Sequence, residues 1–386
     1  MRCTKAIIHL DNLKSNIINI RKFIKPATKM CVAVKADAYG HGAVECAKAA
    51  EECGVEFMAV ATVDEGVELR NAGIKANILL LSLCCPEEVP AAVENEITPL
   101  VFDKEYISLF DMAASNRKDK SKKYPVHLAV DSGMGRIGCH YEQALELAKF
   151  INSTENLTLG GMQTHFAVSD SVESKNRKYT AHQHEYFMKA INAVKDDGKI
   201  DPGICHCANS AATLDLPEYQ MDMVRPGIIL YGYYPDQLTK EYFEKKGTPI
   251  DLKPVMTLET EVTAIRKFPK GKSIGYGRTW KAKTDTNIAV LTIGYADGLF
   301  RRFSTSKIEV AINGKSYPIC GRICMDQCMV DLGKDTDVKR WDKAVIFGAK
   351  EDGALQTAAD IAKKTGTISY EITSAITKRV PRVFVK

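Results

Sequence analysis

The chain of 386 residues contains no uninterrupted apolar run of about eighteen residues, the length that a membrane-spanning helix requires. Its first residues, MRCTKAIIHLDNLKSN, include only a brief apolar segment and no small-residue cleavage site of the kind that ends a secretory signal. We therefore expect a soluble, cytoplasmic protein without a membrane partner. Hydrophobic residues make up 45% of the chain and charged residues 26%, and no region is poor enough in apolar residues to indicate disorder.

A strong excess of either charge is also absent. The 53 Lys and Arg residues and 48 Asp and Glu residues give a formal net charge of +5, spread along the sequence. The densest basic run, NRKDKSKK from Asn116 to Lys123, contains an aspartate and no aromatic residue, which is typical of a solvated loop. Nucleic acid is therefore not an expected partner.

Cysteine is frequent, with twelve residues, but its spacing matches no metal-binding pattern. Cys205 and Cys207 have no second cysteine pair nearby, and the three cysteines between residues 320 and 328 fit neither zinc nor common iron–sulfur spacings. Without a secretory signal, the cysteines are expected to be reduced thiols. We predict no metal site.

From residue 5 to about 240, short apolar or β-branched runs alternate with segments of helical periodicity, which is typical of repeated βα units around a parallel sheet. In one such segment, Leu145, Ala148 and Ile151 can share a helical face. The count of strands favours a closed (β/α)8 barrel of the TIM type, to which the first strand need not belong. The predicted strands are KAIIHL, MCVAVKA, FMAVAT, ILLLS, ITPLV, VHLAVDS, LTLGGMQTHF, GICHCAN and MVRPGIILYG.

The pattern changes after about residue 245 to valine- and threonine-rich strands with glycine turns, such as TLETEVTAIRKF and KIEVAINGKSYPICG. A polar stretch, DQLTKEYFEKKGTPIDLKP, connects the two parts. We predict an α/β barrel domain over residues 1–245, followed by a smaller, mostly β C-terminal domain over residues 246–386.

Lys35 follows directly on the apolar run of a predicted barrel strand, in CVAVKADAYGHG. Catalytic residues of such barrels lie at the C-terminal ends of the strands. A lysine in a partly apolar barrel mouth loses some of its preference for the charged form, and the neutral amine can act as a nucleophile or a base. The alternative is a lysine that extends its charged end to the surface.

A second polar cluster follows two later barrel strands. Asn209 and Ser210 lie where a strand ends and a helix begins, and Gly227 and Ile228 follow the next strand. Backbone N–H groups at these loops commonly bind phosphate in barrels, although a serine N-cap and a Pro-Gly turn would also explain them. A lysine nucleophile that faces a phosphate site indicates pyridoxal 5′-phosphate as the cofactor.

Nine motifs, in order, carry a family resemblance over nearly the whole chain: AVKADAYGHG, DSGMGRIG, THFA, ANSAA, RPGIILYG, GYGRT, IGYADG, GRICMDQ and SYE. The sequence resembles the alanine racemase family. The resemblance implies an isomerase that interconverts L-alanine and D-alanine by a two-base mechanism on a pyridoxal-phosphate Schiff base. Its product D-alanine would serve peptidoglycan synthesis.

The resemblance also assigns roles to residues. Lys35 would hold the cofactor and then act as the base on one face of the substrate carbon, with Tyr276 as the base on the other face. His165 would contact this tyrosine. Arg225 would lie against the pyridine nitrogen, held there by His206. The remaining assignments are Arg136 and Met325 for the substrate carboxylate, Tyr39, Ser210, Gly227, Ile228 and Tyr370 for the cofactor phosphate, and Asn209 as a supporting residue.

In the family, the tyrosine base and the methionine reach from the β domain into the partner's barrel, so the resemblance implies a head-to-tail homodimer with shared active sites. Tyr295, Asp326, Ile368 and Asp170 resemble residues that line the channel to the site. One position departs from the pattern: Ala129 stands where many relatives carry a carbamylated lysine that positions the arginine, so Arg136 needs another partner.

Three alternatives stay open at this point. A serine or broad-specificity amino-acid racemase would share these motifs, although the bulk of Tyr370 favours a small substrate. A non-catalytic pyridoxal-phosphate carrier on the same barrel would lack the β domain and its motifs. A related decarboxylase would place an acidic residue where this chain has Arg225.

Overall fold

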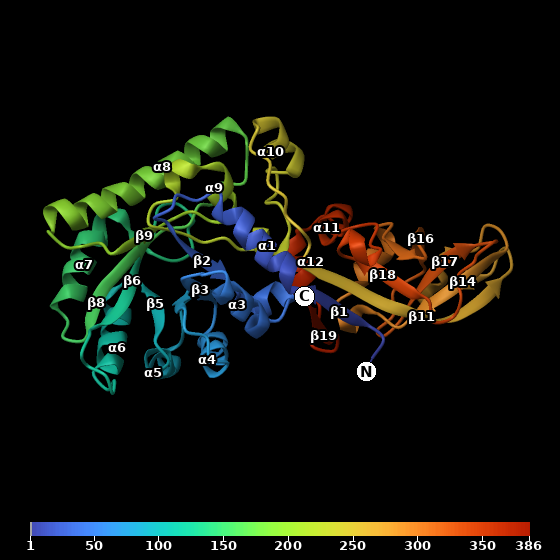
Figure 1. Ribbon diagram of the computed structural model, residues 1–386, viewed down its shortest axis with the longest axis horizontal. Helices are drawn as coiled ribbons and strands as arrows, with labels where there is room; N and C mark the ends of the chain where they lie inside the picture. Colours follow the sequence, from blue (N-terminus) through green and yellow to red (C-terminus); the bar gives the residue numbers. More distant parts are fainter. Residues whose placement is uncertain (1) are drawn as a thin grey trace.

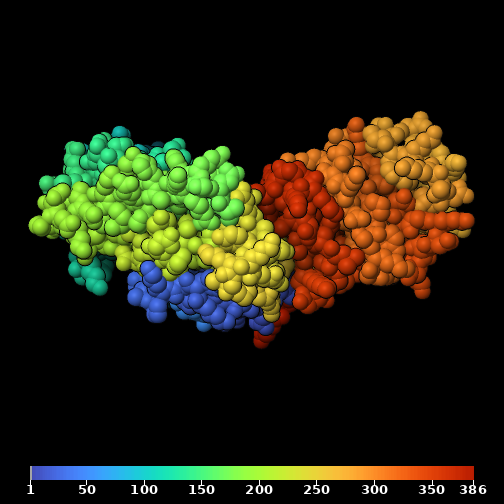
Figure 2. All heavy atoms as spheres, turned by 90° about the horizontal axis from the view of Figure 1, so that it is seen from above, coloured from blue at the N-terminus to red at the C-terminus, as the bar shows by residue number. Residues whose placement is uncertain are grey.

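The computed structural model describes residues 2–386 and consists of two lobes that meet at a narrow waist (Figures 1 and 2). The parallel barrel forms one lobe and an antiparallel β domain the other, which confirms the predicted fold class. The segment around residue 240 lies beside residues 357–370 at the waist (Figure 2). The boundary predicted at residue 245 falls inside helix α10 (Lys240–Lys246) of this connection.

The barrel strands are short and almost entirely buried, because a parallel sheet is covered on both faces. Their spatial order follows the chain: β10 (Met223–Val224), β2 (Lys29–Ala33), β3 (Phe57–Val60), β4 (Asn77–Leu80), β5 (Ile97–Val101), β6 (Tyr124–Asp131), β8 (Leu157–Gln163) and β9 (Ile204–His206). The ring closes between β9 and β10, where the Asp222 N–H donates to the Cys205 carbonyl (3.1 Å) and the Arg225 N–H donates to the Ala208 carbonyl (2.8 Å).

Amphipathic helices cover the outside of the barrel (Figure 1). In α7, Ala148 and Ile151 are buried as predicted, whereas Leu147 rather than Leu145 completes the buried face. The outer helices are α1 (Leu10–Arg21), α3 (Ala43–Glu52), α4 (Val63–Asn71), α5 (Val89–Glu94), α6 (Lys104–Ala114), α7 (Ala144–Ser153), α8 (Ser174–Asn192) and α9 (Ser210–Asp215). A two-stranded pairing of β7 (Cys139–His140) with β6 lies at the barrel mouth.

The second lobe is built on the long strand β11 (Met256–Phe268), which pairs with β1, β14 and β18. The sheet order is β14 (Thr286–Leu291), β17 (Cys328–Gly333), β16 (Lys315–Cys320), β15 (Glu309–Ile312), β18 (Lys343–Phe347), β11, β1 (Lys5–His9) and β19 (Arg382–Val385). Helices α11 (Ala358–Thr365) and α12 (Ser369–Ser374) lie at the end that faces the barrel (Figure 1).

The structure settles one alternative that the sequence left open and differs from one prediction. The first predicted strand, β1, lies outside the barrel and joins the sheet of the second lobe, where it pairs with β11 and β19. In the last predicted barrel strand, only Met223 and Val224 are extended, and Ile228–Tyr231 form the 3-10 helix η5. Gly227 precedes η5 with a backbone conformation (φ −128°, ψ −95°) that turns the chain out of the strand.

Candidate active site

Lys35 begins a left-handed turn at the C-terminal end of β2. Within this turn, α2 (Lys35–Gly40), residues 36 to 39 have φ values of 52° or 53°, although none of them is glycine. Glu65 supports the turn from α4, since its Oε1 accepts a hydrogen bond from the Ala36 N–H (2.6 Å). A left-handed conformation costs a residue with a side chain roughly 1–2 kcal/mol, and such strain is concentrated at functional sites.

The Lys35 side chain faces a cavity of about 400 Å³ at the barrel mouth. The predicted site residues that line this cavity are Lys35, Tyr39, Arg136, His165, Asn209, Ser210, Arg225, Gly227 and Tyr370. Burial, together with the nearby Arg136 charge, lowers the pKa of Lys35. Within the described residues, its amine forms no hydrogen bond or ion pair, so it is available to react.

Arg225 is buried and lines the cavity, and its guanidinium is held by hydrogen bonds to oxygen and nitrogen acceptors. Its guanidinium donates to His206 Nδ1 (2.7 Å), to the Thr164 carbonyl (2.7 Å) and to His165 Nδ1 (3.3 Å). His206 therefore carries its proton on Nε2, from which it donates to Nδ1 of His127 (2.9 Å). Burial, with the Arg225 charge, lowers the pKa of His165 to about 3 and that of His127 to about 4, so both rings are neutral.

Two helix starts, at Ser210 and Ile228, form a cradle of backbone N–H groups beside the cavity. Ser210 is the first residue of α9, and Ile228 is the first residue of η5, where backbone N–H groups lack intrahelical acceptors. The Ser210 hydroxyl accepts from the Gly227 N–H (2.8 Å), and Asn209 caps α9 by accepting from the Ala212 N–H (3.1 Å). The cradle is thus preformed by two chain segments.

Two tyrosines border the cradle. A side chain at position 227 would place its Cβ 2.8 Å from the Tyr39 hydroxyl, so only glycine leaves this space open. The ring of Tyr39 lies 5.6 Å from that of Tyr370, which α12 brings in from the C-terminal domain of the same chain. Burial raises the pKa of Tyr39 to about 12, so its hydroxyl stays protonated and can donate a hydrogen bond.

Arg136 lines the cavity but is exposed and has no hydrogen-bond partner among residues 2–386. Ala129, where the sequence pattern lacks a lysine, is fully buried in β6. Its neighbour across the strand pair is Gln163, which also lines the cavity. The structure thus supplies no acidic partner for Arg136 in the chain that it describes.

Tyr276 and Met325 lie elsewhere in the chain. Tyr276 follows the hairpin strand β12 (Ser273–Ile274), ahead of its partner β13 (Trp280–Lys281), in the 3-10 helix η6 (Tyr276–Arg278), and 64% of its surface is exposed. Met325 is 52% exposed, and neither residue lines the Lys35 cavity. One chain therefore does not bring the two predicted bases together, nor does it join His165 to Tyr276 by a hydrogen bond within the described residues.

The four predicted channel residues divide in the same way. Asp170 lines the cavity, and its pKa is raised by burial. Tyr295 and Asp326 lie with Met325 in the β domain, and Ile368 precedes α12; the side chains of Tyr295 and Ile368 are 37% and 56% exposed.

Two residues that the sequence analysis did not single out belong to the site. His127 extends the Arg225 and His206 chain, and its signal was a polar residue inside the apolar strand VHLAV. Glu65 holds the Lys35 turn, and its signal was the capping-box pattern that starts at Thr62 in α4. Neither sequence pattern identifies the residue that is contacted, because His206 is distant in the sequence from His127, and Ala36 from Glu65.

Among residues 2–386, no group of three or more His, Cys, Asp or Glu side chains is arranged to hold a metal ion. In the same range, no helix has the length and apolar character needed to cross a bilayer.

The fold and the cavity define a two-domain barrel protein with an unpaired lysine of lowered pKa at the barrel mouth. The family model "Alanine racemase, N-terminal domain" matches residues 8–235, and "Alanine racemase, C-terminal domain" matches residues 255–384. The chain belongs to the alanine racemase family, and the predicted family and enzyme class are confirmed.

Individual relatives match this chain over nearly the full length of both sequences. The alanine racemase of Treponema denticola is 50% identical over 100% of this chain and 99% of the relative. The solved structure of an alanine racemase from Clostridium difficile 630 has a TM-score of 0.90 and 38% identity, covering 100% of this chain and 96% of that one. An alanine racemase from Bacillus anthracis with bound L-Ala-P has a TM-score of 0.89 and 37% identity, covering 100% and 96%.

Proposed function

We propose that the protein is a pyridoxal 5′-phosphate-dependent alanine racemase that interconverts L-alanine and D-alanine. One observation carries the proposal. An unpaired Lys35 amine of lowered pKa faces a cavity that is also lined by Ser210 and Gly227 at two helix starts and by the buried guanidinium of Arg225. The relatives named above agree with this activity.

The residues of the cavity fit the cofactor. The Ser210 hydroxyl, which the Gly227 N–H holds in place, and the N–H groups of Ser210 and Ile228 are the donors that a phosphate requires, and Tyr39 can donate a hydrogen bond beside them. Lys35 offers an amine for the aldehyde. When bound, the cofactor withdraws electrons from the substrate Cα and makes its proton easier to remove.

Arg225 sets the electrostatic character of the far end of the site. Its guanidinium is always charged and has only donors, so a ring nitrogen that faces it acts as an acceptor and is held unprotonated. His206 and Thr164 fix the direction of the guanidinium through two 2.7 Å hydrogen bonds. Arg225 thus moderates the electron withdrawal and limits side reactions such as transamination.

Lys35 and Tyr276 move the proton. Racemisation requires a base on each face of the Cα, because the proton leaves on one side and is replaced on the other. Lys35 can accept a proton because burial favours its neutral amine. Tyr276 lies outside the cavity of its own chain, so we propose a head-to-tail homodimer in which it enters the barrel of the partner subunit.

Arg136 and the Met325 N–H bind the substrate carboxylate in this arrangement, since both are free of partners in the described chain. Tyr370, half-buried at the cradle, limits the space for the substrate side chain and favours alanine over larger amino acids. We further propose that the enzyme acts in the cytoplasm and supplies D-alanine for peptidoglycan.

Absorption and labelling test the cofactor assignment. The protein loaded with the cofactor is expected to absorb at wavelengths above about 400 nm. Borohydride treatment followed by peptide mapping should then locate the label on Lys35. A label on another lysine would refute the assignment. Racemisation rates for L-alanine and L-serine, measured side by side, decide the substrate.

Tyr276→Phe tests the second base. This variant should keep the cofactor spectrum and lose at least about 100-fold in kcat, which is the usual contribution of one general base. Retained activity would contradict the role of Tyr276. Sedimentation of the loaded protein should show a dimer, and a fully active monomer would contradict the shared site.

A further inference from the structure

The peptide bond before Met325 is held in a fixed orientation. The Tyr295 N–H donates to the Cys324 carbonyl (3.0 Å), and the Ala296 N–H donates to the Met325 carbonyl (3.0 Å). These contacts require close backbone approach, because a Cβ on Gly294 would lie 2.3 Å from the Met325 carbonyl oxygen. The turn over residues 294–297 and the loop over residues 321–327 are therefore packed backbone to backbone.

The direction of the Met325 N–H follows from this contact. In a planar trans peptide, the C=O of one residue and the N–H of the next point in opposite directions. With the Cys324 carbonyl fixed on the Tyr295 N–H, the Met325 N–H must point away from the turn. It has no acceptor among residues 2–386, and so remains available to a ligand.

Asp297 holds the turn over residues 294–297 in place. Its side chain is fully buried, and Oδ2 accepts from the Gly294 N–H (3.0 Å). Arg2 binds both carboxylate oxygens, at 2.5 and 2.8 Å, and also donates to the Thr292 carbonyl (2.9 Å). Burial opposes the charged form, but the hydrogen bonds from Arg2 and Gly294 keep the pKa of Asp297 below its usual value.

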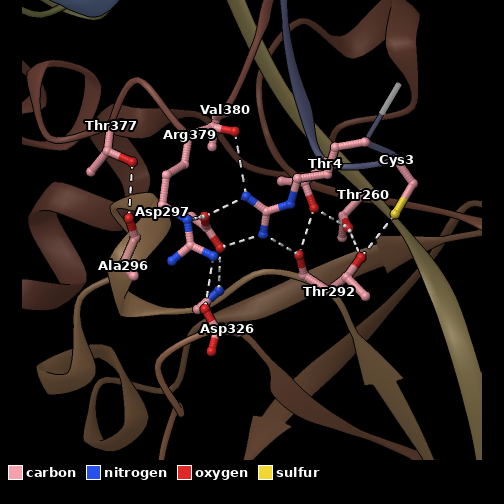
Figure 3. A network of polar contacts seen from close by, with 12 residues as sticks. Cys3, Thr4, Thr260, Thr292, Ala296, Asp297, Asp326, Thr377, Arg379 and Val380 are labelled. Atoms are coloured by element: carbon pink, nitrogen blue, oxygen red, sulfur yellow. Dashed lines mark hydrogen bonds and ion pairs between the residues drawn. The ribbon is translucent and has the colours of Figure 1, made fainter.

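Arg379 connects this anchor to the loop on its other side. Its Nε lies 3.5 Å from Asp297 Oδ1, and its terminal nitrogen donates to Asp326 Oδ1 at 2.8 Å. Figure 3 shows Arg379 between the carboxylates of Asp297 and Asp326. The residue directly after Met325 is thus tied to the same buried carboxylate that fixes the turn.

We propose that Asp297, bridged by Arg2 and Arg379, is a positioning residue that aims the Met325 N–H at the substrate carboxylate. The inference rests on the proposed racemase function and extends it to residues that do not touch the substrate. It also gives Arg2 a role, because Arg2 lies 295 residues before Asp297 and ties the segment ahead of β1 to the turn.

The test compares three variants with a matched control. Asp297→Asn keeps the shape but removes the charge, Arg379→Gln removes the link to Asp326, and Arg379→Lys restores a cation. Glu259→Gln is the control, since Glu259 is also a buried acid paired with two cations, Lys5 and Lys343, that links the N-terminal strand to the β domain. Glu259 makes no hydrogen bond to the turn or the loop within the described residues.

The readouts are kcat and KM for L-alanine and inhibition by propionate, which is alanine without its amine and reports carboxylate binding. We expect Asp297→Asn and Arg379→Gln to raise KM and the propionate inhibition constant together by about tenfold, which corresponds to one charge-assisted hydrogen bond. We expect kcat to change little and the cofactor spectrum to stay the same. Arg379→Lys should recover part of the loss, and Glu259→Gln should stay within about twofold of the wild type.

Each outcome decides a specific point. If both Asp297→Asn and Arg379→Gln keep the wild-type KM and propionate constant, or if Glu259→Gln changes them equally, the inference is overturned. Should Asp297→Asn fail to fold, Arg379→Gln decides alone, because the Arg379 side chain is 46% exposed and its loss leaves no buried gap. A wild-type protein that does not racemise alanine would overturn the proposed function instead.

Discussion

Replacing Ala36 by glycine should stabilise the protein, which is the reverse of what this substitution does in an ordinary helix. Ala36 is exposed and has φ 52° and ψ 49°, so its Cβ stands in a left-handed conformation. Relief of this conformation is worth about 1–2 kcal/mol. The greater freedom of glycine in the unfolded chain takes back about 0.4–1 kcal/mol. We expect a net increase of about 0.8 kcal/mol in the free energy of unfolding, from the midpoints of these two ranges.

Urea unfolding at 25 °C measures this effect against a control at a right-handed position. Ala181 is exposed in the middle of the 19-residue helix α8, and Ala181→Gly should cost about 0.5–1 kcal/mol there. The two variants should therefore move the midpoint in opposite directions at an unchanged slope. The backbone hydrogen bond from Ala36 to Glu65 is available to glycine and cancels from the comparison.

A loss of stability in Ala36→Gly equal to that in Ala181→Gly would refute the reasoning. It would mean that the left-handed turn carries no strain at Ala36, so that holding Lys35 and Tyr39 toward the cavity costs the fold nothing. A gain confined to Ala36→Gly would show that the barrel stabilises a strained turn directly after Lys35.

Two further predictions concern the buried histidines. Burial lowers the pKa of His41 and His127 to about 4. Between about pH 6.5 and pH 4, these histidines are therefore protonated in the unfolded chain and neutral in the folded chain. The free energy of unfolding should be greatest above about pH 6.5 and should fall by roughly 3 kcal/mol per histidine toward pH 4. Urea unfolding across this range checks it, and a flat profile would contradict it. His206→Leu removes the acceptor of the Arg225 guanidinium and should cost about 3 kcal/mol, whereas His206→Asn keeps an acceptor near Nδ1 and should cost about 1 kcal/mol. Equal losses in these two variants would show that the hydrogen bond to Arg225 contributes little.

Structural features that depend on neighbouring residues in the sequence were predicted well. The eight barrel strands, the change to a β domain and the position of Lys35 at a strand end follow from hydrophobic runs and from the rule that barrel sites lie at strand ends. The same rule predicted that Ser210 and Gly227 would lie at one site. In the structure, the Gly227 N–H donates to the Ser210 hydroxyl at 2.8 Å. The roles of these residues, and those of Tyr276 and Met325, remain proposals.

Local patterns failed where backbone geometry or distant partners decide. The apolar letters IILY suit a strand or a short helix equally, and the turn at Gly227 selects the helix η5. Four left-handed residues in succession have no sequence signature when none is glycine. The contacts from Tyr370 to Tyr39 and from His127 to His206 join residues that are far apart in the chain.

The amino-acid sequence by itself determined the family, the barrel and the chemical groups at its mouth, because strand burial and motif order are encoded in neighbouring residues. Only the tertiary structure decided that β1 leaves the barrel for the second lobe, that Arg2 reaches Asp297, and that Tyr276 lies outside the Lys35 cavity of its own chain. These outcomes depend on how two lobes are packed, and the energy of that packing belongs to pairs of residues that no local pattern connects.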